Sequence, residues 1–293
     1  MTSIFLVGMA VADFVFDVEE MPRTAEKHRA TGARIVGGGG AANAAVAISR
    51  LGGTAHLAGR LGTDPVGDVI ASGLEAEGVD LSQTSRTAGA LSSYSSVFID
   101  RDGERQIVNF RGAGLPDRPA WSTPPFDAVL VDTRWEAGAL EAMNLARTRG
   151  VPGVVDAEAP APLPVIAAAS HVAFSMQGLV DLTGLTDPEA ALRAARVHTP
   201  AWLAVTDGAN GVWTLDGDRL DHHPAERVAV VDTLGAGDIW HGAFALALAE
   251  GRDEPSAVRF ASAAAALKCT RPGGRDGAPT RQDLDRYLKE TAP

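Results

Sequence analysis

The sequence predicts an α/β fold: a three-layer sandwich in which helices cover both faces of a central, mainly parallel sheet that carries a small β-sheet lid. Short apolar runs alternate with helical patterns along most of the chain, which is typical of a parallel sheet covered by helices. Two regions, at about 12–36 and 90–112, break this rhythm with alternating segments joined by turns. The 293 residues show no internal repeat and no linker, so we expect a single domain over 1–293 with lid strands in those two regions.

The elements of the core follow from apolar runs and helix stop signals. The expected core strands are short and apolar, and they lie at 4–7, 55–58, 128–131, 153–155, 172–174 and 202–205. The expected helices lie at 41–51, 66–77, 136–149, 239–249, 255–268 and 281–290. Two glycines, Gly52 and Gly53, mark the end of the first helix.

The lid is predicted from two hairpins. Residues 14–18 are expected to pair with 29–35, and residues 92–99 with 104–110. The second hairpin turns at Asp100-Arg101-Asp102-Gly103, a sequence rich in turn formers. The simplest arrangement of these two hairpins is a four-stranded lid that projects from the edge of the main sheet.

Composition narrows the function. Lys and Arg total 26 and Asp and Glu total 37, so the net charge is −11, and we expect neither a nucleic-acid nor a membrane partner. A single cysteine, Cys269, excludes an intrachain disulfide framework and a multi-cysteine zinc site. The first residues lack the basic region and apolar length of a signal peptide, so we expect a cytoplasmic enzyme.

The strongest functional signal is the run Asp-Thr-Leu-Gly-Ala-Gly-Asp at 232–238, which leads into an apolar helix. A turn of small residues (Gly235, Ala236 and Gly237) lets an anion approach the free amides and the positive dipole end of that helix. Asp238 beside such an anion could take a proton from an attacking hydroxyl. Taken alone, the motif also fits an ordinary helix capped by Asp238.

A second signal is the run of four glycines at 37–40 that leads into the first helix. Four successive glycines carry a large entropic cost, which a close backbone contact with a polyol would explain. Asn43 could then bond a hydroxyl of that polyol. A flexible loop followed by a helix-start asparagine is the alternative.

Together these signals resemble the ribokinase-like (PfkB) family of sugar kinases. Residues 38–45, with Gly52 and Gly62, fit the family's N-terminal signature, and residues 232–245 fit its C-terminal signature. Residues 8–13 resemble its first-strand motif, and residues 206–212 resemble its nucleotide-side turn. The matches run in the family's order from about residue 4 to residue 280, so the resemblance implies a ribokinase-like sandwich with a lid over the sugar.

The resemblance also implies site residues. Asp238 matches the catalytic base, and Gly235, Ala236 and Gly237 match the anion hole. Asp13, Gly39 and Asn43 match sugar contacts. The positions matching the ATP side are Thr206, Gly208, Gly211, Ala265, Cys269 and Gly273.

The same family uses ATP with Mg²⁺, and some members bind a monovalent cation such as K⁺. The resemblance places that cation near Asp232 and the loop 272–277. The family's Asn-x-x-Glu motif, which orders water around Mg²⁺, is replaced here by Ser175-Met176-Gln177-Gly178, so no residue is assigned to the metal.

A narrower resemblance is to the 6-deoxy-6-sulfofructose kinases, carried by residues 132–135, 258–262 and 265–275. It implies that Lys27, Asn109 and Arg134 bind a sulfonate. Lys27 and Asn109 belong to the two predicted hairpins, and Arg134 follows a core strand at the edge where α/β proteins bind ligands. Solvated side chains are the ordinary alternative for each cation.

The sequence therefore predicts an ATP-dependent kinase acting on C1 of 6-deoxy-6-sulfofructose, to give the 1-phosphate, and a homodimer formed through the lid. The alternatives are a fructokinase, a ribokinase, a nucleoside kinase or a non-catalytic sugar-binding regulator. We expect His241 to be structural or to lie behind the reacting groups, and we assign no metal site to His222 and His223.

Overall fold

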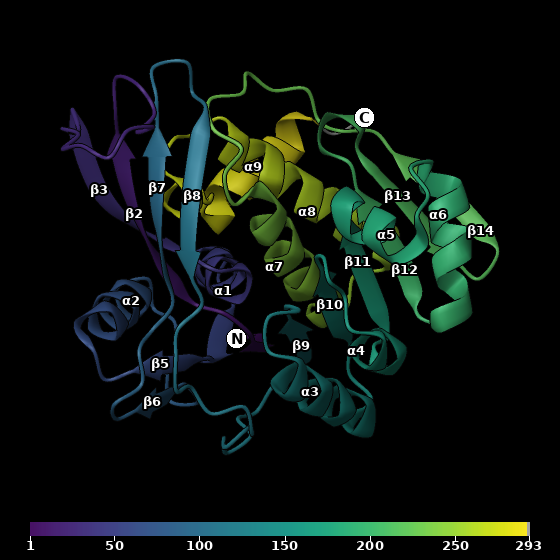
Figure 1. Cartoon of the computed structure of the whole chain (residues 1–293). Coiled ribbons are helices and arrows are strands. Elements are labelled where there is room, and N and C mark those ends of the chain that lie inside the picture. The colour runs from purple at the N-terminus through teal and green to yellow at the C-terminus, as the bar shows by residue number, and fades with distance from the viewer. Residues whose placement is uncertain (292–293) are drawn as a thin grey trace.

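The computed structural model describes residues 1–291. The central sheet has eight strands in the order β14-β13-β12-β11-β10-β9-β1-β4 (Figure 1). Its strands are β1 (Ser3–Val7), β4 (Thr54–Ala58), β9 (Ala128–Val131), β10 (Gly153–Ala157), β11 (His171–Ser175), β12 (Trp202–Thr206), β13 (Val212–Asp216) and β14 (Arg219–His223). The six strands from β12 to β4 in this order pair in parallel, and only β13 runs against the others, because it pairs antiparallel with both β12 and β14. The predicted α/β architecture is confirmed.

Helices cover both faces of this sheet. One layer contains α1 (Gly40–Arg50), α2 (Pro65–Glu75), α7 (Ala236–Ala249), α8 (Glu254–Cys269) and α9 (Arg281–Glu290). The other contains α3 (Glu136–Arg149), α4 (Leu163–Ala168), α5 (Met176–Thr183) and α6 (Pro188–Ala195). Strand β1 divides the two cores by alternation, because Ile4 and Leu6 face the first layer and Phe5 and Val7 the second.

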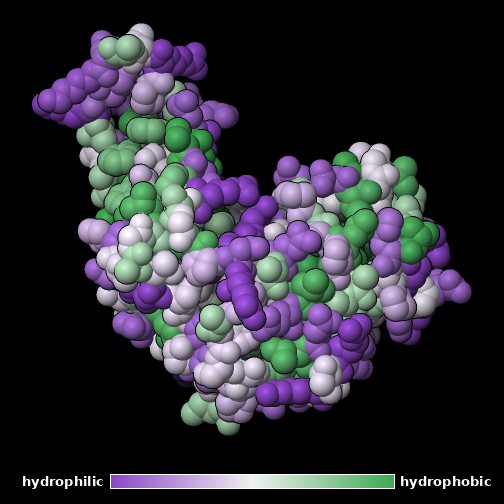
Figure 2. All heavy atoms as spheres, turned by 60° about the horizontal axis from the view of Figure 1, so that its bottom comes forward, coloured by the Kyte–Doolittle hydropathy of each residue, from purple (hydrophilic) through white to green (hydrophobic). Residues whose placement is uncertain are grey.

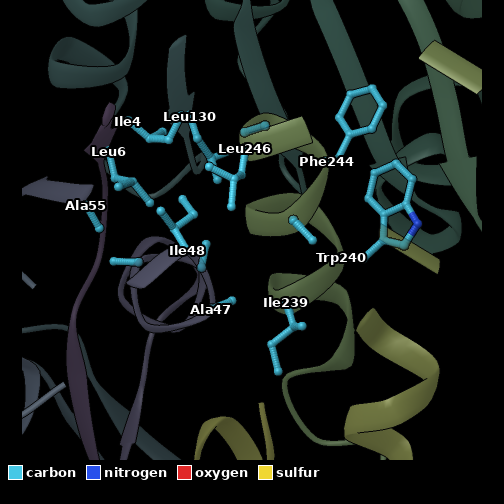
Figure 3. Packing of buried hydrophobic residues seen from close by; sticks show 14 of the residues in the cluster. Ile4, Leu6, Ala47, Ile48, Ala55, Leu130, Ile239, Trp240, Phe244 and Leu246 are labelled. Atoms are coloured by element: carbon cyan, nitrogen blue, oxygen red, sulfur yellow. The ribbon is translucent and has the colours of Figure 1, made fainter. Parts of the chain in front are cut away.

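Helices α1 and α7 lie at the centre of the first layer. Figure 3 shows Ile48 of α1 and Leu246 of α7 meeting beside Leu6 of β1. All three side chains are fully buried. These two helices bring the glycine run and the Asp238 segment, which lie almost 200 residues apart in sequence, to the same end of the sheet.

The lid is a separate four-stranded sheet with the order β3-β2-β7-β8. It consists of β2 (Val11–Asp17), β3 (Gly32–Gly38), β7 (Tyr94–Ile99) and β8 (Arg105–Phe110). Both hairpins were expected, but the parallel pairing of β2 with β7 that joins them was not. In Figure 2 the lid projects from the body as an arm with a hydrophilic tip, and the surface is hollowed beside it.

Several elements differ from the sequence prediction. Helix α7 begins at Ala236, three residues before the expected start, because Gly235 in a left-handed conformation (φ 76°) already turns the chain into the helix. The elements α4, α5, α6, β13 and β14, and the short pair β5 (Arg60–Gly62) and β6 (Ser85–Thr87), were not predicted. Within residues 1–291, no helix combines the length and apolar character needed to cross a membrane.

Candidate active site

The start of α7 forms an open cradle for an anion. Gly235 occupies the N-cap position, and no side chain caps the helix. A Cβ built on Gly237 would meet no atom within 4 Å, so the space in front of this turn is free. The first-turn amides and the helix dipole therefore face a site that can take a phosphoryl group.

Asp238, in the first turn of α7, is held by α1. Its Oδ2 accepts a 2.6 Å hydrogen bond from Nδ2 of Asn43. Burial and, after it, the nearby Asp156 carboxyl raise the pKa of Asp238 to about 7, although the hydrogen bond from Asn43 opposes the shift. A carboxyl with a pKa near neutrality is suited to accept a proton from a substrate hydroxyl. The Oδ1 of Asn43 is buried without a hydrogen-bond partner in the described chain, so it is free to accept a bond from a ligand.

Behind Asp238 lie two buried groups: Asp156, which the sequence analysis did not single out, and His241, which it expected to be structural or to lie behind the reacting groups. Asp156, at the end of β10, is 4% exposed, and its Oδ1 lies 3.5 Å from Nε2 of His241. The Nδ1 of His241 lies 2.8 Å from the carbonyl oxygen of Gly237, and its Nε2 lies 3.2 Å from that of Ala173. Burial raises the pKa of Asp156 and lowers that of His241. A polar residue ending a buried strand, at the carboxyl edge of the sheet, was the available signal for Asp156.

A third carboxyl, Asp132 at the end of β9, fastens the edge of the site. It accepts hydrogen bonds from the amides of Met9 (2.7 Å), Ala41 (3.1 Å) and Arg134 (2.9 Å). These bonds join the end of β1, the start of α1 and the loop after β9. Gly39 precedes α1 with a φ of 96°, and a Cβ there would lie 2.3 Å from the carbonyl oxygen of Met9. Only glycine fits this junction.

The lid contributes a row of polar side chains. Asp13 of β2, Ser95 of β7 and Asn109 of β8 are cross-strand neighbours. Nδ2 of Asn109 donates to Oγ of Ser95 at 3.1 Å. Burial raises the pKa of Asp13, and the Ser95 hydroxyl opposes that shift. Such a row can bond the hydroxyls of a polyol.

The three residues expected to bind a sulfonate have different surroundings in the structure. Arg134 is already paired, with Nη2 2.6 Å from Oε2 of Glu158 and Nη1 donating to the carbonyl of Ala159 at 2.8 Å. Lys27 is exposed in the connection between β2 and β3. Within residues 1–291, no hydrogen bond or ion pair links Lys27, Asn109 and Arg134 to one another. Nothing in the positions of Lys27, Asn109 and Arg134 along the sequence indicated that Glu158 pairs with Arg134.

The residues expected on the nucleotide side lie on two neighbouring units. Thr206 ends β12, Gly208 opens the 3₁₀ turn Gly208–Asn210, and Gly211 follows that turn. Gly211 has a φ of 93°, and a Cβ there would lie 2.1 Å from the carbonyl oxygen of His223. The second unit is the end of α8, with Ala265, Cys269 and, just beyond the helix, Gly273.

The end of α8 is tied to the turn before α7. The carbonyl of Cys269 accepts hydrogen bonds from the amides of Val231 (2.8 Å) and Asp232 (3.2 Å). Burial raises the pKa of the Cys269 thiol, which suits a packing role better than a nucleophilic one. These bonds bring the end of α8, with Cys269, next to the segment that leads into the anion cradle.

The position of the missing Asn-x-x-Glu motif has a structural explanation. Ser175 caps α5, with Oγ accepting from the amide of Gly178 at 3.0 Å. A Cβ at Gly178 would lie 2.2 Å from the carbonyl oxygen of Ala157, so no glutamate fits where the family motif has one. Within residues 1–291, no group of three or more His, Cys, Asp or Glu side chains could hold a metal ion. The open cradle fits a nucleotide phosphate, and the described residues do not surround Mg²⁺ with such a group of side chains.

Comparison with known proteins agrees with this geometry. The pfkB family carbohydrate kinase profile matches residues 1–281. A ribokinase of Bacillus subtilis is 30% identical over 295 residues, covering 98% of this chain and 100% of its own, and a fructokinase of Vibrio alginolyticus is 27% identical over 317 residues, covering 98% and 99%.

Two solved structures extend the likeness to the fold. A putative ribokinase from Agrobacterium tumefaciens has a TM-score of 0.91 at 38% identity and covers 99% of this chain and 98% of its own. The Arabidopsis thaliana ribokinase complexed with ribose and ATP has a TM-score of 0.88 at 25% identity, with 99% of each chain covered. These relatives are called ribokinases and a fructokinase, so they support the general sugar-kinase interpretation better than the sulfofructose one. The chain belongs to the pfkB family of carbohydrate kinases, and it is an ATP-dependent sugar phosphotransferase.

Proposed function

We propose that the protein transfers the γ-phosphoryl group of ATP to a hydroxyl of a free sugar such as ribose or fructose, with Asp238 as the base. The observation that carries this proposal is the half-buried Asp238 carboxyl, held by Asn43 beside the open turn of α7. The names of the relatives support the sugar class. Asp13, Asn43 and the backbone at Gly39 hold the sugar between lid and sheet.

The chemistry follows from this placement. Asp238 accepts the proton of the sugar hydroxyl as its oxygen bonds to the γ-phosphorus. The bond from phosphorus to the bridging oxygen breaks, and ADP leaves with that electron pair. Amides of the turn Gly235–Gly237 stabilise the charge on the transferring oxygens. The lid excludes water that would otherwise hydrolyse ATP. Mg²⁺ supplies charge neutralisation when it arrives bound to ATP, and no side chain of the chain is assigned to it.

A second candidate is the phosphorylation of 6-deoxy-6-sulfofructose at C1. Arg134 favours it, because its guanidinium lies at the carboxyl edge of the sheet with a partner, Glu158, whose side chain is 48% exposed. A substrate sulfonate would have to compete with that carboxylate for the same donors. Lys27 and Asn109 would contribute only if the lid brought them to the same anion.

The experiment is ADP release across ribose, fructose, fructose 6-phosphate, 6-deoxy-6-sulfofructose and adenosine. We expect the highest kcat/KM for a neutral sugar. A preference for sulfofructose would select the second candidate, and a preference for adenosine would select a nucleoside kinase. Binding of sugar without ADP release from any member of the panel would contradict the kinase mechanism.

We also propose that the lid forms a homodimer. The lid leaves Ile35, Ile107 and Val108 exposed, at 52%, 59% and 63%. Exposed apolar side chains on short strands favour pairing with a second copy. Sedimentation of the wild type and of Val108→Lys tests this proposal, and a wild type that is monomeric at every concentration contradicts it.

A further inference from the structure

Lys268 is a fully buried cation in the last turn of α8. Its Nζ donates a 2.7 Å hydrogen bond to the backbone carbonyl of Asp232 and a 3.4 Å bond to that of Arg271. It also lies 3.0 Å from Oδ2 of Asp232. A lysine is rarely buried completely unless it is paired, and here the chain itself provides three oxygens around the ammonium.

The oxygens around Lys268 hold the turn that leads to the anion cradle. Oδ1 of Asp232 accepts from the amide of Leu234 at 2.9 Å, and Oδ2 accepts from the amide of Gly274 at 3.0 Å. Burial raises the pKa of Asp232, but these two amides and Lys268 outweigh it, so the pKa stays below its usual range. Asp232 thus joins the segment before α7 to the loop after α8, with Lys268 as the counter-charge.

This arrangement conflicts with the monovalent cation that the family resemblance placed at Asp232 and the loop 272–277. Such an ion needs carbonyl and carboxylate oxygens from these same two segments. Three of those oxygens already surround a positive charge that the chain itself supplies. A second cation among them would be repelled and would lack ligands. The residues present therefore do not fit K⁺ at this place.

We propose that the ammonium of Lys268 takes the place of a bound monovalent cation, so that the kinase needs no K⁺. The inference rests on the proposed role of the turn Gly235–Gly237 as the anion hole. Lys268 is a positioning residue: it holds Asp232, and Asp232 holds the turn. The ammonium of Lys268 stabilises the segment before the cradle through Asp232, and no cation from the medium is needed there.

The first test is the cation dependence of the wild type. Sugar-dependent ADP release is measured in potassium chloride and in tetramethylammonium chloride at equal ionic strength. We expect kcat and KM to agree within about twofold, because the cation is covalently attached and its occupancy does not depend on salt. Activation by K⁺ of about tenfold or more would overturn the proposal.

The second test is a matched pair of variants, Lys268→Ala and Lys268→Met. Both remove the charge, but alanine opens space for an ion, whereas methionine keeps the volume of the stem. In tetramethylammonium we expect both to lose about 10²-fold in kcat, the scale of a misplaced reacting geometry. K⁺ or NH₄⁺ should restore Lys268→Ala and not Lys268→Met. Full activity of both variants without K⁺ would contradict the inference, as would equal rescue of the two.

Thermal melting separates this inference from the proposed function. The melting temperature of the wild type should not depend on K⁺, whereas that of Lys268→Ala should rise as K⁺ is added. This readout stands even if no sugar of the panel is phosphorylated, in which case the proposed function fails alone. If neither variant folds in any salt, the cation titration of the wild type decides. An active wild type that K⁺ both stimulates and stabilises would overturn the cation inference and leave the kinase assignment standing.

Discussion

The phosphoryl side of the site and the lid side are built in different ways. The phosphoryl side is assembled from α1, α7 and α8, which belong to one buried core, and its charged groups have short contacts with buried partners. The lid side is a four-stranded sheet that projects from the body, and of its two expected anion ligands Lys27 is exposed and Asn109 is bonded to Ser95. Core packing therefore fixes the chemistry, while the lid leaves the identity of the sugar open.

This difference explains why the class of reaction can be inferred from the structure more readily than the identity of the substrate. A cradle of backbone amides and a buried carboxyl has the same function whichever sugar supplies the hydroxyl. Substrate choice should depend on a few side chains at the rim of the site, where one ion pair such as Arg134–Glu158 changes the charge that a ligand meets. Substitutions on the two sides should accordingly differ in size and in kind.

The largest effect is expected at the phosphoryl side. Asp238→Asn should lower kcat by about 10²–10⁴-fold with little change in the KM for ATP, because the amide cannot accept the proton. The same change should raise the melting temperature above pH 7. A carboxyl whose pKa is raised by burial destabilises the fold as pH rises towards that pKa, and asparagine removes this cost.

The control for this variant is Asp253→Asn. Asp253 caps α8 from the surface, and asparagine caps helices equally well, so both activity and melting temperature should be unchanged. Turnover of Asp238→Asn close to that of the wild type would show that another group takes the proton.

The next largest effect is expected from a substitution that fills the space in front of the anion cradle. Gly237→Val should lower kcat by about 10²-fold, because the branched side chain occupies the space in front of the amides. Since a Cβ at this position meets no protein atom within 4 Å, the fold should tolerate the change. Sugar affinity, measured by calorimetry without ATP, should stay within about twofold. If Gly237→Val instead lost sugar binding while its rate of ATP hydrolysis stayed normal, the turn Gly235–Gly237 would not be the anion-binding site.

A smaller effect concerns pH. Asp238 must be a carboxylate to act, so kcat/KM should fall as pH drops through about 7. The negative charge of Asp156 raises the pKa of Asp238, whereas burial lowers the pKa of His241 below its usual value, so that this ring is neutral near pH 7. Asp156→Asn should therefore move the acidic limb down, and His241→Asn should leave it in place. A purely structural role for Asp156 would lower the rate at every pH without shifting the limb.

The smallest effect is expected at the rim. Arg134→Ala should change kcat/KM for ribose and fructose by less than about threefold, because this arginine is occupied by Glu158 and the sugars are neutral. Arg147→Ala, on the surface of α3, provides the control. A selective loss of about 2–5 kcal/mol on sulfofructose would instead show that Arg134 binds an anionic tail, and would favour the second candidate.

Much of the fold could be predicted from the sequence. The apolar run at 128–131 and the helices at 136–149 and 281–290 have the observed bounds, because burial and helix formation there depend on neighbours along the chain. The parallel junction of β2 and β7 could not be predicted, since their pairing joins hairpins about 80 residues apart and leaves no local pattern.

For the site, the sequence alone determined the glycine turn before α7, the glycine run before α1 and the presence of Asp238 beside the former. These are local features: they depend on which residues follow one another, and their conformational needs appear in the residue types. Only the tertiary structure decided that Asn43 bonds Asp238, that Asp156 lies behind it, that Glu158 holds Arg134 and that Lys268 pairs with Asp232. Each of these depends on two groups that are distant in sequence or lie on different elements. The distance between the two groups of each pair is set by the packing of helices and strands, and it cannot be read from the order of residues in the sequence.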